Sequence, residues 1–540
     1  MQLSRLYKRR SLTIRRSAAI AVIASIAITG CNATGGSAND APSSPVQGGA
    51  VVAALSGDPQ TLDMAQNTGS LTIRVAINIF EQLFVIDKNY QPAPMLASGY
   101  EKSADGLTYT IKLRSDVKFH NGDRMTAGDV IASLKRWQLV SAVGKSVAKD
   151  VASIASTDPQ AVTITLHQPR YSFIDDLAAT TQPAIIVPAA VAEEAGTSPI
   201  ADDKIIGTGP YKLKEYKHGQ SVVLVRFDGY SSRDDTSSGL AGAKKAYIDT
   251  IEFRFVPDPA QQLNGLKSGQ FQWAQSVNAD EYEALKNSPN LKARVADSGL
   301  VATILINHSA DSSFSDLKAR QALNMAIDKK AMAQASFGPK EFWSPLSGAL
   351  VFSVDKPMYS QAGKDIYETF DPKKAKKLFE AAGVTANKPI RLVTTQTYPK
   401  YYQMAVVLQS QLEKLGLKTD MQVYDFPTMI SKISTDSSNW DISFSAYNGT
   451  VTSPSQVLPL APNRPGEFHS GDLDTLKAKY QISKDPAEAK KIVDQIQQLV
   501  WEELPVISVA PNKVFDVYST SLKDVSTFTQ SIFWNCYLAA

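Results

Sequence analysis

The sequence predicts an α/β protein built from more than one lobe. Its 540 residues exceed the ~250–300 residues at which a single hydrophobic core stops growing. Strand and helix patterns alternate along the chain, and the stretch 390–424 has the strand–helix–strand order of a βαβ unit. Repeated units of this kind indicate open sheets, with ligand contacts at the loop ends between lobes.

The N-terminal residues are typical of a signal peptide. Six basic and no acidic residues lie within 1–16, and the apolar run SAAIAVIASIAITG follows. This run is shorter than the ~20 residues that cross a bilayer. The next residues, Ile28-Thr29-Gly30-Cys31, resemble a bacterial lipobox, whose cysteine becomes the lipidated first residue of the mature chain. We expect a signal peptide over 1–30 and lipidation of Cys31; a plain signal peptide with an incidental cysteine is the alternative.

A flexible tether is predicted next, over 31–48. The stretch NATGGSANDAPSSPVQGG contains Gly, Ser, Pro, Asn and Ala but too little apolar mass to pack. A lipoprotein cysteine carries enough acyl chains for stable anchoring. The expected location is therefore the periplasm or cell envelope, with the chain anchored to a membrane by lipid. Asn32 leaves open which membrane holds the anchor.

Charge and cysteine content exclude several classes of function. Removing the six leader charges turns the formal net charge of +3 into −3, so nothing favours a nucleic-acid partner. If Cys31 is lipidated, only Cys536 remains, and no internal disulfide can form. A large chain has enough core to fold in an oxidising compartment without one. No later segment has the length and apolarity of a membrane span.

In the first half, each element is predicted from its hydrophobic period. Alternation or a short apolar run indicates strands, and spacing of three to four indicates helices. Thr126 is a plausible N-cap for the second helix. The predicted elements are, in order, strand Ala50–Ser56, helix Thr72–Phe84, strand Thr108–Leu113, helix Ala127–Trp137, and strands Val162–Leu166 and Val222–Phe227.

In the second half, start and stop signals strengthen the same patterns. The predicted βαβ unit consists of strand Ile390–Thr394, helix Gln403–Leu415, ended by Gly416, and strand Lys418–Tyr424. Its strands should be parallel, with a right-handed crossover. Asp371-Pro372 and Asp485-Pro486 each place a capping acid before a proline, which marks two further helix starts, and Gly383 ends the first of these helices.

Several segments with recognisable patterns are spread across nearly the whole mature chain. They are GDPQTLDMAQNTGS (57–70), the long segment from FEQLFVIDKNYQPAP to DVIASLKRW (80–137), IGTGPYKLKEYKHGQ (206–220), DPAQQLNGLKSGQF (258–271), INHSADSSFSDLKARQALNMAIDKKAM (306–332), FDPKKAKKLFEAAG (370–383) and LPVISVA (504–510). Together, and in this order, they resemble family 5 of the bacterial extracellular solute-binding proteins, the dipeptide-, oligopeptide- and nickel-binding subunits of ABC importers.

The resemblance implies a periplasmic-binding-protein-like α/β fold, with two hinged lobes of the large three-subdomain peptide-binding type. Lobe I would comprise 49–298 and 513–540, with an inserted subdomain at about 66–200, and lobe II would comprise 299–512. The lobes would close around a solute that binds the closed state better than the open one. The implied partners are a peptide or small-molecule solute and the permease and ATPase subunits of the importer. The chain itself is expected to be a monomer.

The resemblance also places the expected binding residues. Peptide-binding members carry an aromatic residue and two acids in a loop after a lobe II strand, roughly Gly-Trp-x-Gly-Asp-x-x-Asp-Pro. Here Tyr447 takes the aromatic position, and Thr450 and Ser453 take the acidic ones. A buried carboxylate would pair a peptide's ammonium group, and Asp425 or Asp441 could substitute for it. The full set of expected contacts is Tyr447, Asn448, Gly449, Thr450, Ser453, Asn67, Thr68, Gly69, Phe342 and Trp343.

The absence of acids at 450 and 453 leaves the class of solute open. Oligopeptides or related amino-acid conjugates are the first expectation, and an opine, a glycoside or a metal chelate is the alternative. Asn67–Gly69 could equally form a plain turn, and Phe342 and Trp343 could pack in the core. Trp534 is expected to pack in the core or at the hinge.

No pattern in the sequence indicates catalysis, a cofactor or a metal. The five histidines are scattered without metal-ligand spacing, and no HExxH or Gly-x-Ser-x-Gly motif occurs. His120 is expected to be structural. An exported hydrolase and an envelope structural lipoprotein or chaperone remain the competing classes of function.

Overall fold

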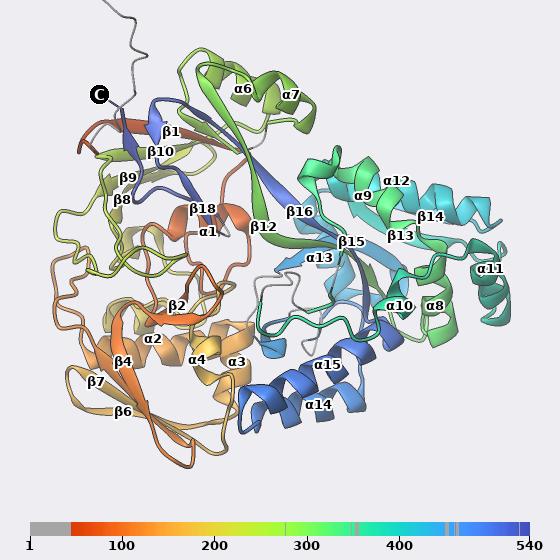
Figure 1. Cartoon of the computed structure of the whole chain (residues 1–540), viewed down its shortest axis with the longest axis horizontal. Helices are drawn as coiled ribbons and strands as arrows, with labels where there is room; N and C mark the ends of the chain where they lie inside the picture. Colours follow the sequence, from red (N-terminus) through yellow and green to blue (C-terminus); the bar gives the residue numbers. More distant parts are fainter. Residues whose placement is uncertain are drawn as a thin grey trace, which may run out of the picture. The chain divides into compact units, whose positions relative to one another are not determined.

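The computed structural model describes residues 45–275, 277–346, 348–350, 356–448, 453–457, 460, 464–528 and 530–539, and these form one compact unit. Figure 1 shows the strands of a long mixed sheet running through this unit, with helices on both sides. The predicted signal peptide, Cys31 and most of the tether lie outside the described residues.

The main sheet has ten strands in the order β14-β13-β15-β12-β16-β11-β1-β10-β9-β8. β1 is parallel to β10 and β11, and β13 is parallel to β14 and β15, whereas the other neighbours are antiparallel. The strands are β1 (Ala50–Leu55), β8 (Tyr211–Lys217), β9 (Ser221–Arg226), β10 (Thr250–Phe255), β11 (Trp273–Ala274), β12 (Leu291–Ile306), β13 (Ile390–Thr395), β14 (Thr419–Tyr424), β15 (Ile442–Asn448) and β16 (Val506–Ser519).

Two long strands join the two halves of this sheet. β12 and β16 pair along most of their length and pass from the half that holds β1 to the half that holds β15 (Figure 1). Their register shifts between Asp297 and Leu300, opposite Lys513 and Asn512. A bulge bends and twists a strand pair locally. The shift lies where the predicted lobe boundaries at 298/299 and 512/513 fall, and those boundaries stay a prediction.

A second, smaller layer lies beside the first half of the main sheet. Its four-stranded antiparallel sheet has the order β4-β5-β7-β6 and its own apolar core. Figure 1 shows it in orange, as a sheet separate from the main one. Its elements are β4 (Ala97–Lys102), β5 (Thr108–Leu113), α2 (Ala127–Val140), α3 (Ala142–Ala148), β6 (Val151–Asp158), β7 (Ala161–Leu166) and α4 (Phe173–Leu177).

Lobe I, as named here, contains this layer, β1 and β8–β11 and the elements around them. Three two-stranded pairs belong to it, namely β2 (Phe84–Ile86) with β3 (Pro92–Pro94), β17 (Leu522–Lys523) with β20 (Tyr537–Leu538), and β18 (Ser526–Phe528) with β19 (Gln530–Ile532). Its other helices are α1 (Ser70–Ala76), α5 (Ala189–Ala195), α6 (Pro259–Lys267) and α7 (Tyr282–Leu285).

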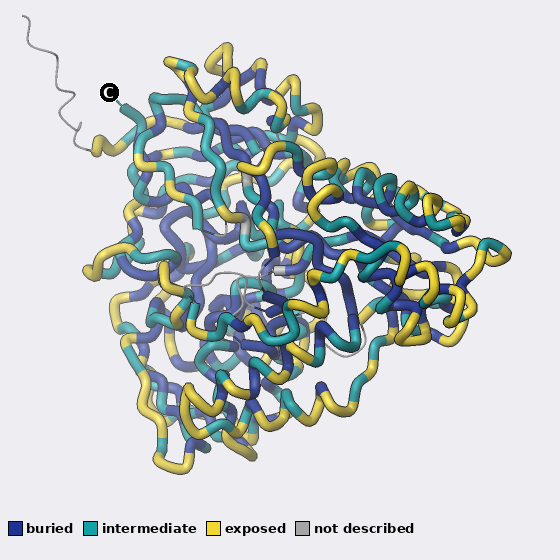
Figure 2. The backbone as a smooth tube through the Cα atoms, turned by 45° about the vertical axis from the view of Figure 1, so that its right-hand side comes forward, coloured by how far each residue is buried: buried dark blue, intermediate teal, exposed yellow. Residues whose placement is uncertain are grey.

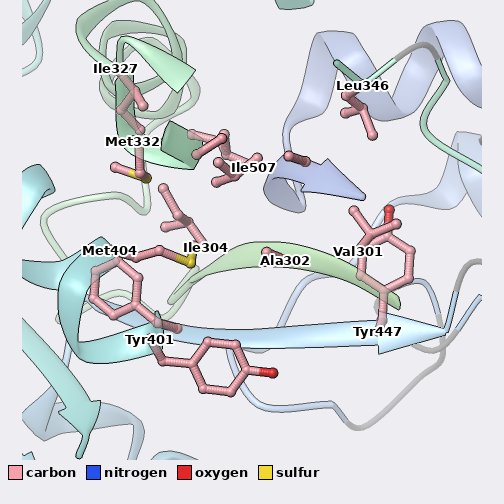
Figure 3. Close-up of a cluster of buried hydrophobic side chains, with 14 of the residues drawn as sticks. Val301, Ala302, Ile304, Ile327, Met332, Leu346, Tyr401, Met404, Tyr447 and Ile507 are labelled. Carbon is pink, nitrogen blue, oxygen red and sulfur yellow. The ribbon is translucent and has the colours of Figure 1, made fainter. Parts of the chain in front are cut away.

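Lobe II, as named here, contains β13–β15 and the helices from α8 onward. A large apolar core fills this lobe and continues to α6 and β11 of lobe I, and Figure 3 shows part of it around Ile304 and Met404. The helices are α8 (Leu317–Ala326), α9 (Lys329–Phe337), α10 (Lys364–Glu368), α11 (Pro372–Ala381), α12 (Pro399–Lys414), α13 (Phe426–Thr435), α14 (Gly471–Gln481) and α15 (Pro486–Glu503). Figure 2 shows buried segments through the interior, and exposed segments on the outer helices and loop tips.

Most predicted elements are confirmed. The four predicted strands of the first half correspond to β1, β5, β7 and β9, and the Thr126-Asp129 capping box begins α2. The βαβ strands β13 and β14 are parallel, and Gly416 has the positive φ of 85° expected after α12. Asp371 and Asp485 accept backbone N–H groups at the starts of α11 and α15. The buried Trp534 is also confirmed, with a side chain in the core.

The helix predicted over 72–84 is wrong in its second half, because α1 ends at Ala76. The Asn78 amide donates to two carbonyls of the last helical turn at 3.0 and 3.2 Å. The Ile79 carbonyl accepts from the Gly209 N–H at 2.8 Å, in a close backbone contact. An added Cβ at Gly209 would lie 2.6 Å from the Asn78 oxygen, so glycine is required there. Apolar spacing alone cannot reveal this tertiary contact.

Candidate functional site

Tyr447 lies at the end of β15 with its side chain in the core of lobe II. Its hydroxyl donates to the Ala349 carbonyl at 3.0 Å and is hydrogen-bonded to Ser508 Oγ at 2.9 Å. Burial raises the pKa of this phenol. Figure 3 shows the ring beside Val301, its register partner on β12. The ring therefore supports the end of β15 from within and does not present its face to solvent.

The loop after β15 reaches toward lobe I. Gly449 and Thr450 lie outside the described residues, as does the side chain of Asn448. Ser453 is buried and is hydrogen-bonded to Tyr480 of α14. The Gln456 side chain donates to the Asp175 carbonyl of α4 at 2.9 Å. This loop therefore bridges the two lobes.

The predicted contacts of lobe I form a turn before α1. The Asn67 side-chain oxygen accepts from the Gly69 N–H at 2.6 Å, which closes an Asx turn. Thr68 and Gly69 are exposed. The Asn67 side chain therefore closes this turn by itself, as the plain-turn alternative expects. Thr68 and Gly69 are accessible to a ligand as well.

Phe342 and Trp343 pack at the junction of lobe II with β16. The Phe342 ring meets those of Tyr282 and Phe515 edge to face, with centroids 5.4 and 5.2 Å apart. The Trp343 indole N–H donates to the Gly338 carbonyl at 3.2 Å. Both side chains are buried, as the packing alternative for this pair expects.

A hollow of about 340 Å³, the aromatic pocket, lies between the lobes. One wall comes from the small layer of lobe I, and the other includes 356–358 and α14 of lobe II. The rings of Tyr171 and Tyr480 are in edge-to-face contact in its lining, with centroids 5.5 Å apart. Its aromatic lining residues are Phe84, Tyr90, Tyr100, Tyr109, Tyr171 and Tyr480. None of the predicted binding residues that the structure describes lines it.

A second hollow of about 290 Å³, the hinge pocket, lies where β12 and β16 join the lobes. Of the predicted binding residues with a described position, Phe342 lines it. Its charged lining residues are Lys400 and Lys513, with no acid beside them in the described lining. The pocket is lined by residues 277–279, 336–337, 342, 398–400 and 512–513.

Lys400 is the most unusual charge in the hinge pocket. It lies in the first turn of α12, directly after the end of β13. Burial lowers the pKa of its ammonium to about 8, and no described carboxylate offsets this effect. The Asn512 amide oxygen faces the ammonium at 3.3 Å when the amide nitrogen donates to the Leu300 carbonyl at 3.2 Å. Sequence reasoning missed Lys400, although its place after a parallel strand is where α/β sheets bind ligands.

The two acids suggested as substitutes have structural partners instead. Asp425 caps α13 by accepting from the Thr428 N–H at 3.0 Å. Asp441 is buried and pairs with Arg391 at 2.9 Å, and it also accepts from the Ser313 N–H at 2.9 Å. Hydrogen bonds from Arg391 and Ser313 hold the pKa of Asp441 below its usual range. Both carboxylates are thus engaged in structural hydrogen bonds, that of Asp441 inside the fold and that of Asp425 on an exposed helix start.

His120 is held by the Gly207–Gly209 turn. Its Nδ1 accepts from the Gly207 N–H at 3.2 Å, and its Nε2 lies 3.0 Å from the Gly209 carbonyl. Because Nδ1 accepts, the neutral ring must carry its proton on Nε2. Within the described ranges, no group of three or more His, Cys, Asp or Glu side chains is arranged to hold a metal. No helix there has both the length and the apolarity to span a membrane.

The sequence matches one family profile over more than half its length. The profile of the bacterial extracellular solute-binding proteins, family 5 (middle), matches residues 91–467. A probable peptide ABC transporter periplasmic-binding protein from Sinorhizobium fredii is 25% identical over 492 residues, which cover 88% of this chain and 90% of that protein. The glutathione-binding protein of Escherichia coli strain K12 is 27% identical over 489 residues, covering 87% and 91%.

Solved structures match the fold over nearly the whole chain. The periplasmic binding protein AgaA of A. tumefaciens R10, in complex with agropinic acid, has a TM-score of 0.78 at 25% identity, covering 91% of this chain and 99% of that one. The binding protein DppA of Helicobacter pylori, in complex with the peptide STSA, has a TM-score of 0.78 at 21% identity, covering 92% and 99%. The predicted periplasmic-binding-protein-like α/β fold is thereby confirmed.

Proposed function

Because this chain belongs to the bacterial extracellular solute-binding proteins of family 5, we propose that it is the solute-binding subunit of an ABC importer. It captures oligopeptides or related amino-acid conjugates between its lobes and delivers them to the permease and ATPase subunits. The match of the family profile over 91–467 carries this proposal. The family consists of the substrate-binding proteins of transporters, and the proposed role involves no catalysis.

The sheet supports a closing motion about its two shared strands. β12 and β16 join the lobes, and their register shift between Asp297 and Leu300 lies between the sheet halves. Hinges are a few residues that absorb the change in backbone angles while packed lobes move as rigid bodies. A solute drives closure only if it binds the closed state more tightly. Contacts from both lobes would provide that difference.

A non-peptide solute is the second candidate. Thr450 and Ser453 stand where peptide-binding members carry acids, and Asp425 and Asp441 are both engaged in structural contacts. An ammonium buried without a carboxylate partner is costly. An opine, a glycoside or a metal chelate therefore stays the alternative, and the fold is shared with a protein solved with agropinic acid.

A binding screen on the mature protein tests the role. Native mass spectrometry of protein purified from its own host should reveal a bound solute at a stoichiometry of one. A thermal-shift panel should then show stabilisation of about 2.7 kcal/mol at a solute concentration 100 times Kd. The panel comprises free peptides, N-acylated peptides, glutathione and agropinic acid. Turnover of a solute would contradict the binding role, and the absence of any stabilising solute would contradict capture.

The envelope location rests on the leader and on Cys31. We expect export, lipidation of Cys31 and attachment of a monomer to the membrane through residues 31–48. Palmitate labelling in cells should mark the wild type and lose its signal in Cys31→Ala. Cys536→Ala is the matched control, since this thiol is fully buried, and its labelling should persist. Size-exclusion chromatography with light scattering tests the monomer. If the wild type were not labelled, lipidation of Cys31 would be contradicted. A plain signal peptide that releases an unanchored chain would then be the remaining alternative.

A further inference from the structure

The hinge pocket lies where an α/β sheet offers polar groups to a ligand. Parallel strands β13 and β14 end on the same edge, and α12 begins there at Pro399. Across the hollow, residues 277–279 follow β11 of lobe I. Asn512 and Lys513 lie on β16, at the register shift between the lobes. A molecule in this pocket would therefore contact both lobes and the hinge strands.

Among the described residues, neither Lys400 nor Lys513 forms an ion pair, although Asp297 lies opposite Lys513 in the strand register. Some buried cations of this chain are paired with acids, such as Arg136, 2.5 Å from Asp63, and Lys244, 2.9 Å from Glu81. Others, such as Arg320, donate to several backbone carbonyls. Lys400 instead faces only the neutral Asn512 amide among the printed polar contacts of the described residues. Lys400 is half-buried, so part of the cost of removing an unpaired cation from water applies to it, and a bound anion would relieve that cost.

Two further groups favour an anion at the same place. Tyr398, the N-cap of α12, makes no side-chain capping bond, although the Tyr401 N–H already donates to the Tyr398 carbonyl at 2.9 Å. By contrast, α11 and α13 are capped by aspartates. Ser336 Oγ in the pocket wall is buried and has no hydrogen-bond partner among the described residues.

We propose that the hinge pocket binds a carboxylate of the captured solute, with Lys400 as its principal partner and Lys513 as a second positive charge. A carboxylate accepts short, charge-assisted bonds from ammonium and hydroxyl groups. The Phe337 and Phe342 side chains supply apolar wall beside these donors, which suits the carbon skeleton next to the carboxylate. The inference rests on the proposed function and adds the solute's charge to it.

The proposal also explains the sequence of the loop after β15. That loop reads SFSAYNGTVTSPSQ and contains no acid. A cation in the hinge pocket together with an acid-free loop favours a solute that carries a carboxylate and lacks a free ammonium group. The fitting solute class is an acid whose amino group is blocked or substituted, such as an N-acylated peptide acid or an amino-acid conjugate.

Four forms of one mixed tripeptide library test this selection. The library is prepared as free acid or C-terminal amide, each with a free or an acetylated amino terminus. Native mass spectrometry measures how much of each the mature protein retains. Wild-type protein should retain acids at least about tenfold over the matched amides, and acetylated acids at least as well as free ones. This comparison needs no variant, so it holds even if a substitution prevents folding.

Variants of one helix identify the residue. Lys400→Met should lower retention of acids at least about tenfold and leave amides unchanged, whereas Lys400→Arg should keep most of the preference. Lys414→Met, an exposed position at the other end of α12, is the control and should behave as wild type. Equal retention of acids and amides by the wild type would overturn the carboxylate site while solute capture stands. Retention of none of the four libraries would overturn the proposed capture of peptides and this inference with it.

Discussion

Single residues in this protein are fixed by burial and hydrogen bonding more than by their chemical type. Tyr447 and Asp441 both belong to residue types that bind ligands, yet their polar atoms are engaged within lobe II. Lys400 has the reverse character, since its side chain is half-buried and faces only the neutral Asn512 amide among the described polar contacts. Because an unpaired buried charge is costly, the position of such a cation is better evidence of a site than its residue type.

Tyr447→Phe separates the structural role of this residue from a binding role. Removal of the hydroxyl leaves the Ala349 carbonyl and Ser508 hydroxyl without this partner, so the free energy of unfolding should fall by about 1–3 kcal/mol. Solute affinity should change less than about threefold. Denaturant unfolding and calorimetry measure the two quantities. Unchanged stability with a large loss of affinity would restore Tyr447 as a ligand contact.

His120 should make stability depend on acid pH. Burial lowers its pKa to about 4 from an ordinary value of 6.5. The unfolded chain therefore binds the proton first, and the stability contributed by the neutral ring is present above pH 6.5 and lost as pH falls through 4. The loss amounts to roughly 3 kcal/mol in full. His120→Asn removes this titration, so the stability difference between wild type and variant should shrink from pH 7 to pH 4.5. A constant difference would show that folding does not lower the pKa of His120.

At the scale of elements, start signals were the most reliable part of the sequence. Asp-Pro pairs mark the beginnings of α11 and α15, because the aspartate accepts N–H groups that have no helical partner and proline fits the first turn. Helix ends were less predictable. α1 stops at Ala76 because a distant turn at Gly209 approaches its backbone, and no local pattern encodes that approach.

Asp425 should act only as a cap. Asp425→Ala removes acceptors for the Thr428 N–H and hydroxyl at the start of α13, which should cost about 1 kcal/mol of unfolding free energy. Asp425→Asn retains an acceptor and should cost much less. Solute affinity should be unchanged in both. A loss of affinity for free peptides in the asparagine variant would instead make Asp425 the carboxylate that pairs their ammonium.

At the scale of the whole molecule, a polar contact holds the small layer of lobe I against α14. The Ser172 hydroxyl donates to the Gln481 side-chain oxygen at 2.9 Å, and the Tyr171 N–H donates to the Gln481 carbonyl at 2.6 Å. Both contacts lie next to the aromatic pocket, which Tyr171 and Tyr480 line. Contacts that form only when lobes meet contribute to the difference between open and closed states.

Gln481→Ala should weaken closure without unfolding either lobe. The variant loses the side-chain contact to Ser172 but keeps the backbone one, so solute affinity should fall about three- to tenfold through faster release. Small-angle scattering should show a larger radius of gyration for the solute-free variant. Ser483→Ala, two residues along, is the control, because its hydroxyl bonds only locally to the Lys479 carbonyl. Unchanged release rates in Gln481→Ala would remove this contact from the closing equilibrium.

The sequence by itself determined the α/β class, the parallel βαβ strands, the capped helix starts and the family. These follow from local periodicity, from the chemistry of caps and turns, and from short segments in a fixed order, none of which needs distant contacts. Only the tertiary structure decided that Tyr447 faces the core, that Asp441 is paired with Arg391, and that Lys400 is left with a neutral partner beside the hinge. The physical reason is that the environment of a polar group is set by what the folded chain brings against it. The residue type determines which interactions a side chain can form, and the fold determines which of these interactions are already formed within the protein.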